Sequence, residues 1–149
     1  MHVVIFDLDH TLFATDNTLY GGVNELLPIL NRLGVHVAGL SNHDQRIFTR
    51  LEEAGIRQFF AEILCIDQHN RPKEPAGVHH VLSKFNAKPH HAVLVSHKHA
   101  DILLGKDVGV RKTIGVTHGK DSNGPLKDAG ADHIVSDVPE VLDVLWLVK

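Results

Sequence analysis

The chain has 149 residues, 43% of them hydrophobic, and a formal net charge of −3. This size predicts a single domain, residues 1–149, with a proper core, and the charge excludes a basic field for nucleic acid or an anionic membrane surface. No apolar run approaches the roughly 18 residues of a membrane span. Cys65 is the only cysteine, which excludes an intrachain disulfide and favours a reducing, cytoplasmic location.

The first predicted element is a strand over residues 3–7. Its continuous Val-Val-Ile-Phe run is typical of a strand buried on both faces of a parallel sheet, and not of a signal peptide. Asp7 and Asp9 follow with i, i+2 spacing, which points both side chains the same way on an extended backbone. We expect them to share one pocket at the end of the strand, where a proton or a cation relieves their repulsion. The alternative is an ordinary polar turn.

Helical and extended patterns then alternate along the first half of the chain. A polar connection over residues 11–20 leads to a helix that starts at Gly21-Gly22 and is ended by Gly34. Ser41 and Asn42 are N-cap residue types that follow the second strand. The other elements expected in this half are a strand at 35–40, a helix at 43–54, a strand at 61–66, a loop at 67–72 and a helix that begins at Lys73-Glu74-Pro75.

The second half repeats this rhythm. Strands are expected at 91–96, 111–116 and 131–135, the last a short edge strand, and helices at 100–108, near 125–129 and at 138–148. Alternating strands and helices of this spacing predict an α/β fold. We expect a three-layer, Rossmann-like parallel sheet of five or six strands, with helices on both faces.

Four groups at the predicted strand ends resemble the motifs of the haloacid dehalogenase (HAD) superfamily. They are Asp7-Leu8-Asp9-His10-Thr11, Ser41, Lys73 within Arg-Pro-Lys-Glu-Pro, and Asp101 after the fourth strand. The stretches 113–119 and 129–137 look like the phosphoglycolate-phosphatase branch. The resemblance covers nearly the whole chain and implies a HAD-like core with phosphatase activity.

The resemblance also implies a role for each motif residue. Asp7 is the expected nucleophile, which forms an aspartyl phosphate. Asp9 is expected to protonate the leaving alkoxide and then to deprotonate water, with its backbone carbonyl on a metal. Ser41 and Lys73 belong to the catalytic set as well. The residues expected to bind the phosphate are Thr11, Ser41, Asn42 and Lys73.

The acidic motif departs from the family pattern. His97 stands where the family commonly has an aspartate that binds Mg²⁺ directly, while Asp101 is retained to hold the metal or its water, or to pair with Lys73. Magnesium prefers oxygen ligands, whereas imidazole suits softer metals. The implied metal residues are thus Asp7, Asp9 and Asp101, with His97 questionable. Three outcomes stay open. The site uses Mg²⁺ weakly, with water in place of the missing ligand; it uses Mn²⁺ or another divalent metal; or the protein binds its ligand without turnover.

The two places where relatives insert a cap domain are occupied here by the predicted helices and strands. We therefore expect an uncapped site, which suits large substrates or cover by another subunit, and the sequence does not name the substrate. Histidine is abundant, with 13 residues. Six of them are expected in loops at the carboxyl edge of the sheet: His10, His43, His69, His97, His99 and His118. They are either ordinary polar loop residues or residues of the site.

The sequence therefore predicts a metal-dependent phosphomonoester hydrolase that acts on a small or larger phosphorylated substrate. The alternative is a catalytically weak or inactive HAD-like module that binds a phosphorylated ligand or a protein partner, because of His97. A response-regulator-like receiver is less favoured, because its acidic pair should precede the phosphoacceptor strand instead of lying two residues apart in one loop. A dehalogenase is less favoured, because that chemistry does not use an acid at the position of Asp9. A homo-oligomer that uses the apolar face of the last helix, with Leu142, Leu145 and Trp146, is left open. The alternative is that this face packs on the sheet of its own chain.

Overall fold

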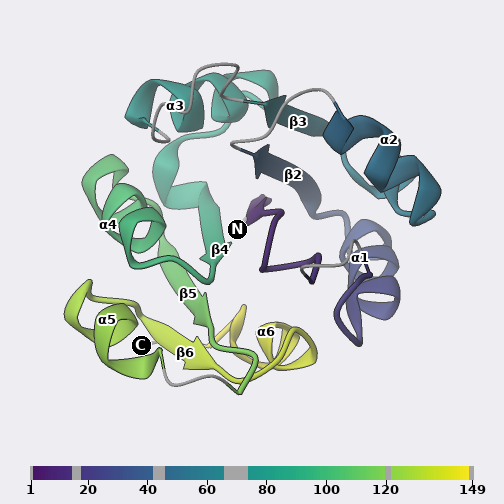
Figure 1. Ribbon diagram of the computed structural model, residues 1–149. Coiled ribbons are helices and arrows are strands. Elements are labelled where there is room, and N and C mark those ends of the chain that lie inside the picture. The colour runs from purple at the N-terminus through teal and green to yellow at the C-terminus, as the bar shows by residue number, and fades with distance from the viewer. Residues whose placement is uncertain (1, 15–17, 42–45, 66–73, 120–121, 148–149) are drawn as a thin grey trace.

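The computed structural model describes residues 2–14, 18–41, 46–65, 74–119 and 122–147. These residues form a six-stranded, all-parallel sheet between two layers of helices (Figure 1), which confirms the predicted α/β fold. The strands are β1 (Val3–Asp7), β2 (His36–Ser41), β3 (Glu62–Cys65), β4 (Ala92–Ser96), β5 (Lys112–Val116) and β6 (His133–Val135).

The strand order is β3-β2-β1-β4-β5-β6. The chain begins in the middle of the sheet, builds outward to β3, and then crosses to the other side of β1 with β4. The connections after β1 and β4 therefore leave the sheet in different directions. In open α/β sheets, this point of reversal is where ligand sites form, at the carboxyl ends of the strands.

Two layers of helices cover the sheet. On one face lie α1 (Val23–Arg32), α2 (Arg46–Glu53) and α6 (Pro139–Val144), and on the other lie α3 (Pro75–Lys84), α4 (His99–Val108) and α5 (Asn123–Asp128) (Figure 1). The 3₁₀ turns η1 (Arg57–Phe59) and η2 (Pro89–His91) precede β3 and β4.

The buried run in β1 joins both layers. Val4 and Phe6 belong to the core that includes α1, α2 and α6, whereas Val3 and Ile5 belong to the core that includes α3 and α4. Successive side chains of a strand point to opposite faces, and all four of these residues are fully buried. This double burial explains why β1 shows a continuous apolar run instead of alternation.

The last helix is shorter than predicted: α6 ends at Val144, whereas the sequence predicted a helix that continues to residue 148. The Nζ of Lys112, a side chain of β5 that is 2% exposed, donates to the carbonyls of Val144, Leu145 and Leu147 at 2.7, 3.4 and 2.7 Å. Orphan carbonyls at a helix end need such partners. A buried lysine thus satisfies the end of α6.

Close packing between α1 and α6 explains one of the two glycines at the start of α1. Gly22 is the N-cap, with φ +90°, and a Cβ there would lie 2.3 Å from the Cγ of Pro139. Only glycine tolerates both conditions. Gly34 follows α1 with φ +78°, as the sequence predicted.

Neither possible insertion point holds a cap domain in the described residues. Between β1 and α1 the backbone makes two isolated bridges, Asp9–Phe13 and Phe13–Leu19. The other connection returns from β2 through α2 and η1 to β3. Among the described helices, none combines the length and the apolar character needed to cross a membrane.

Candidate functional site

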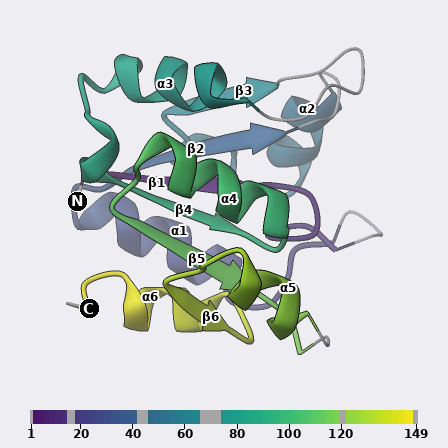
Figure 2. The same ribbon diagram turned by 90° about the vertical axis from the view of Figure 1, so that its left-hand side faces the viewer.

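The predicted site residues that the structure describes meet at the carboxyl edge of the sheet. Figure 2 shows the strands from the side, with their arrowheads toward one edge. Asp7 ends β1, Ser41 ends the neighbouring β2, and Ser96 ends β4 on the other side. Asp7, Asp9 and Ser41 are only 2%, 9% and 0% exposed. Polar side chains this deeply buried need hydrogen-bond partners, and the site supplies them in two groups.

The first group surrounds Asp7. Thr11 Oγ1 donates to Asp7 Oδ2 at 2.9 Å, and His97 Nδ1 lies 3.0 Å from the same oxygen. The backbone N–H of His97 donates to Thr11 Oγ1 at 3.1 Å. An ionised carboxylate only accepts hydrogen bonds, so with Asp7 ionised the Nδ1 of His97 carries a proton. Thr11 and His97 therefore hold the Asp7 carboxylate in one orientation.

The second group surrounds Asp9. Arg50 Nη1 donates to Asp9 Oδ1 at 2.6 Å, and Ser41 Oγ donates to Asp9 Oδ2 at 3.5 Å. The Arg50 guanidinium lies over the ring of Phe13, with Cζ 4.5 Å from the ring centroid. Sequence reasoning missed Arg50. The available signal was a basic residue three positions after the buried Ile47, on the inward face of an amphipathic helix.

Asp7 and Asp9 have different hydrogen-bond partners, and their sharing of one pocket stays a prediction. The hydrogen bonds described above turn Asp7 toward Thr11 and His97, but Asp9 toward Arg50 and Ser41. The i, i+2 rule applies to an extended backbone, and β1 ends at Asp7. Beyond it the chain turns tightly, with His10 at φ +62°. Among the described residues, each carboxylate thus has a hydrogen-bond donor of its own beside it.

Asp101 supports the loop that carries His97. It lies in the first turn of α4, is 5% exposed, and accepts a hydrogen bond from Ser96 Oγ at 2.7 Å. The backbone N–H of Lys98 donates to the same hydroxyl at 3.1 Å. Ser96 thus joins the end of β4 to the start of α4. The predicted roles of Asn42 and Lys73, including a Lys73–Asp101 pair, concern residues outside the described ranges.

The predicted phosphate contacts of Thr11 and Ser41 stay predictions. Both side chains are fully buried. The hydroxyl of Thr11 donates to Asp7, and the hydroxyl oxygen of Ser41 lies 3.5 Å from Asp9 Oδ2. Each hydroxyl therefore holds a carboxylate in the arrangement seen here.

Three of the six edge histidines lie close to the Asp-x-Asp-x-Thr loop. The ring of His10 lies edge-on to that of His97, with centroids 5.6 Å apart. His118 Nε2 lies 3.1 Å from the carbonyl oxygen of Thr11, and the His118 ring stacks on the Tyr20 ring, with centroids 3.4 Å apart. His99 was expected in a loop but is the first residue of α4 and is exposed. His43 and His69 lie outside the described residues.

The described residues do not match the donor set that Mg²⁺ prefers. Within this part of the chain, no three His, Cys, Asp or Glu side chains gather as a metal-binding group. Asp7 Oδ2 receives a hydroxyl, and an imidazole nitrogen lies next to it. Magnesium requires oxygen ligands in near-octahedral geometry. That imidazole nitrogen belongs to His97, the residue that the resemblance aligns with a metal-binding aspartate.

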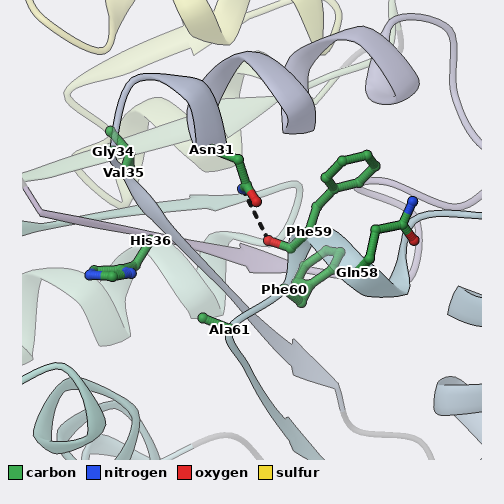
Figure 3. A pocket seen from close by; sticks show the side chains of 8 residues that line it. All are labelled: Asn31, Gly34, Val35, His36, Gln58, Phe59, Phe60 and Ala61. Carbon is green, nitrogen blue, oxygen red and sulfur yellow. Dashed lines mark hydrogen bonds between the residues drawn. The ribbon is translucent and has the colours of Figure 1, made fainter.

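A pocket of about 210 Å³ lies at the opposite edge of the sheet (Figure 3). His36 begins β2, and Ala61 directly precedes β3, so this pocket is located where the strands start. Asn31 Nδ2 donates to the Phe59 carbonyl within it at 3.1 Å. None of the predicted site residues lines it; its lining residues are Asn31, Gly34, Val35, His36, Gln58, Phe59, Phe60 and Ala61.

Comparison with protein families and curated sequences gives a consistent result. The profile of the family described as "Haloacid dehalogenase-like hydrolase" matches residues 13–116. The chain is 28% identical over 134 residues to a phosphoglycolate phosphatase of Haemophilus influenzae, covering 85% of this chain and 57% of the relative. It is 27% identical over 142 residues to the pyrophosphatase PpaX of Oceanobacillus iheyensis, covering 92% and 65%. The chain thus spans less than two thirds of the length of these relatives.

Solved structures share the fold. A HAD phosphatase from Thermococcus onnurineus superposes with a TM-score of 0.87 at 14% identity, over 98% of both chains. A predicted phosphoglycolate phosphatase from Haemophilus somnus superposes with a TM-score of 0.74 at 26% identity, over 85% of this chain and 57% of that one. The first likeness concerns the fold alone.

Proposed function

Because this chain belongs to the haloacid dehalogenase-like hydrolase family, we propose that it hydrolyses phosphate monoesters through an aspartyl phosphate on Asp7. The observation that carries this proposal is the buried carboxylate of Asp7 at the carboxyl end of the central strand. Thr11 and His97 hold it in one orientation, and a second acid, Asp9, follows two residues later.

The proposed reaction has two displacements. In the first, a carboxylate oxygen of Asp7 forms a bond to phosphorus while the ester P–O bond breaks, and Asp9 gives a proton to the leaving oxygen. In the second, water attacks phosphorus, Asp9 accepts a proton from that water, and the Asp7 carboxylate is released with inorganic phosphate. Thr11 and His97 hold the Asp7 carboxylate from the side of Oδ2. Fixing the nucleophile in this way reduces the entropic part of the barrier.

The relatives indicate which substrates to test. One is named a phosphoglycolate phosphatase and the other a pyrophosphatase. Both named substrates combine a phosphoryl group with a second anionic group, a carboxylate in one case and a phosphate in the other. We propose small phosphorylated anions of this kind as substrates.

We assign no chemical step to a metal ion, since the described donor set does not match Mg²⁺. The family resemblance implies a divalent cation, and we propose that His97 weakens Mg²⁺ binding relative to a member with aspartate at this place. The loss of an oxygen ligand and of a negative charge supports this proposal. The His97–Asp7 contact also favours the second candidate, a HAD-like module that binds phosphorylated ligands without turnover.

We further propose that residues 1–149 form one domain and that the protein works in the cytoplasm. The first proposal is supported by one sheet that runs through the described residues, and the second by the single cysteine.

Phosphate release from p-nitrophenyl phosphate and from phosphoglycolate, with Mg²⁺, Mn²⁺, Co²⁺, Zn²⁺ or a chelator, tests this function. We expect release in at least one condition, and none from the Asp7→Asn variant. Binding of a phosphorylated ligand without release in any condition would establish the non-catalytic module instead.

A further inference from the structure

We propose that Arg50 of α2 selects phosphate esters whose leaving group carries a second anionic group, and that it does so by binding this group beside Asp9. The proposal deepens the function above and rests on it in one respect, namely that Asp9 faces the leaving oxygen. It makes Arg50 a substrate-binding residue, and not only a partner of Asp9.

The first observation is the position of the Arg50 guanidinium. Its Nη1 lies 2.6 Å from Asp9 Oδ1, and the two side chains are 18% and 12% exposed. The guanidinium is therefore neither in the core nor on the open surface. It lies at the partly open rim of the site, where a bound molecule can reach it.

The second observation is that the guanidinium is held from two sides. Asp9 fixes one amino group, and the fully buried ring of Phe13 lies under the plane, 4.5 Å from Cζ. Arg50 Nε is buried and has no hydrogen-bond partner within the described part of the chain. The donors left for a ligand are therefore on the terminal amino groups. A cation fixed in this way loses little conformational freedom when it binds an anion.

The reaction geometry places Arg50 on the side of the leaving group. In a displacement at phosphorus, the nucleophile and the leaving oxygen lie on opposite sides of the phosphorus atom. A proton donor must lie within hydrogen-bond distance of the leaving oxygen, which puts Asp9 there. Arg50, bonded to Asp9, is consequently next to the leaving group and away from the attacking face of Asp7.

A guanidinium at this place discriminates by charge. A planar guanidinium has five N–H donors and binds carboxylate or phosphate oxygens with paired hydrogen bonds. The single bond to Asp9 leaves donors for such a contact, so a carboxylate or phosphate close to the leaving oxygen gains a charge-assisted hydrogen bond. A neutral leaving group cannot make this bond. The described residues hold no cap domain, and Arg50 is a residue of the core at a place where it can make this selection.

Binding of two nonhydrolysable phosphonates to the full chain tests the proposal. The pair is 3-phosphonopropanoate and 3-phosphonopropanamide, which have the same shape and differ by one negative charge on the part that mimics the leaving group. By calorimetry, the wild-type chain should bind the carboxylate about 10- to 100-fold more tightly than the amide, the scale of one charge-assisted hydrogen bond.

Variants assign this preference to Arg50. Arg50→Gln should remove most of the preference and change the affinity for the amide by less than about 3-fold, since the neutral amide makes no charge-assisted hydrogen bond to Arg50. Arg50→Lys should keep part of it, because lysine retains the charge without the fork. Arg32→Gln is the control: it makes the same change in net charge in the exposed last turn of α1, at the other edge of the sheet, and should keep the full preference.

Three results would overturn the proposal: a wild-type chain that does not distinguish the two phosphonates, one that binds neither, or an Arg50→Gln variant that loses affinity for both alike. The last result would mean that Arg50 only positions Asp9. If Arg50→Gln does not fold, the wild-type preference and Arg50→Lys decide. Turnover is scored separately, so that a preference without hydrolysis would contradict the proposed function and leave the role of Arg50 standing.

Discussion

The two edges of the sheet differ in the hydrogen bonds that their polar side chains make. At the carboxyl edge, buried carboxylates bond to other side chains: Asp7 to Thr11, Asp9 to Arg50 and Asp101 to Ser96. At the amino edge, the buried Lys112 bonds instead to backbone carbonyls at the end of α6, and the exposed Asn31 to that of Phe59. Asp132 accepts there from the side chains of Lys106 and Thr113 as well as from the Thr113 backbone N–H. Bonds to the backbone fix where elements lie, whereas bonds between side chains can be exchanged for bonds to a ligand.

This difference predicts separate effects. Substitutions at the carboxyl edge should change activity and leave stability nearly intact, and those at the amino edge should do the reverse. A substitution at either edge with the opposite effect would break the comparison.

The largest effect is expected for Asp7→Asn. The change removes the nucleophile but keeps the shape and an acceptor oxygen for Thr11. We expect turnover to fall by at least about 10⁴-fold, and the free energy of unfolding in urea to change by about 1 kcal/mol or less. Steady-state phosphate release and urea titration measure the two quantities. Normal turnover in this variant would exclude the covalent mechanism.

Asp9→Asn should have the next largest effect. An alkyl phosphate has a poor leaving group that needs a proton, so its kcat/KM should fall by about 100-fold or more. The value for p-nitrophenyl phosphate should fall less, because nitrophenolate leaves without protonation. Equal losses for the two esters would argue against an acid–base role and would indicate that the Asp9–Arg50 pair only shapes the site.

His97→Asp should improve the use of Mg²⁺. The change restores a carboxylate oxygen next to Asp7, and two carboxylates so close repel each other unless a cation lies between them. We expect Mg²⁺ affinity or Mg²⁺-supported activity to rise by about 10-fold or more, because even indirect partners of a metal site change affinity by 10- to 100-fold.

A second readout for His97→Asp does not depend on turnover. Mg²⁺ should raise the melting temperature of the variant more than that of the wild type, since a ligand that binds only the folded state stabilises it. If neither activity nor melting temperature responds, His97 does not occupy the ligand position of the family.

Lys112→Met tests the amino edge. It removes the donor that satisfies the carbonyls of Val144 and Leu147 at the end of α6, and should lower the free energy of unfolding by about 1–3 kcal/mol. The value of kcat/KM should stay within about 2-fold of the wild type, because no site residue moves. Lys106→Met is the matched control: the Lys106 side chain is 40% exposed and pairs with Asp132, so its loss should cost at most about 1 kcal/mol.

The smallest effect is expected from His133, the first residue of β6. Burial lowers the pKa of His133, and the charge of Lys112 lowers it further. The unfolded chain therefore takes up a proton here near the ordinary pKa of 6.5, while the folded chain does not. The free energy of unfolding should fall as the pH falls from 6.5 toward the lowered value. Urea titrations at several pH values should show a smaller fall for His133→Gln than for the wild type; equal falls would mean that His133 does not contribute.

Local sequence patterns predicted most of the fold. The buried run before Asp7, the glycine after α1 and the alternation of strands and helices depend on neighbours in the chain, so their meaning can be read in sequence. The same holds for the placement of Asp7, Ser41 and Asp101 at one edge, because strand ends of a parallel sheet share an edge.

The features that were missed depend on distant contacts or on local torsion angles. Arg50 reaches Asp9 across 41 positions, and Lys112 reaches Val144 across 32. Amphipathic spacing shows that a helix is buried but not which polar group lies opposite. No residue pattern indicated the separate hydrogen-bond partners of Asp7 and Asp9, or the positive φ of His10 that follows them.

The position of β1 in the middle of the sheet has a consequence for synthesis on the ribosome. β1 and β2 are close in sequence, but the other partner of β1 is β4, which pairs Val3 with Ala92. A nascent chain that ends before β4 therefore exposes one unpaired edge of its most apolar strand, and such edges pair readily with other chains. His97, which lies 90 positions beyond Asp7, joins the site only after this long loop has closed. The nucleophile Asp7 is thus synthesised early, but its contact with His97 forms only late in folding.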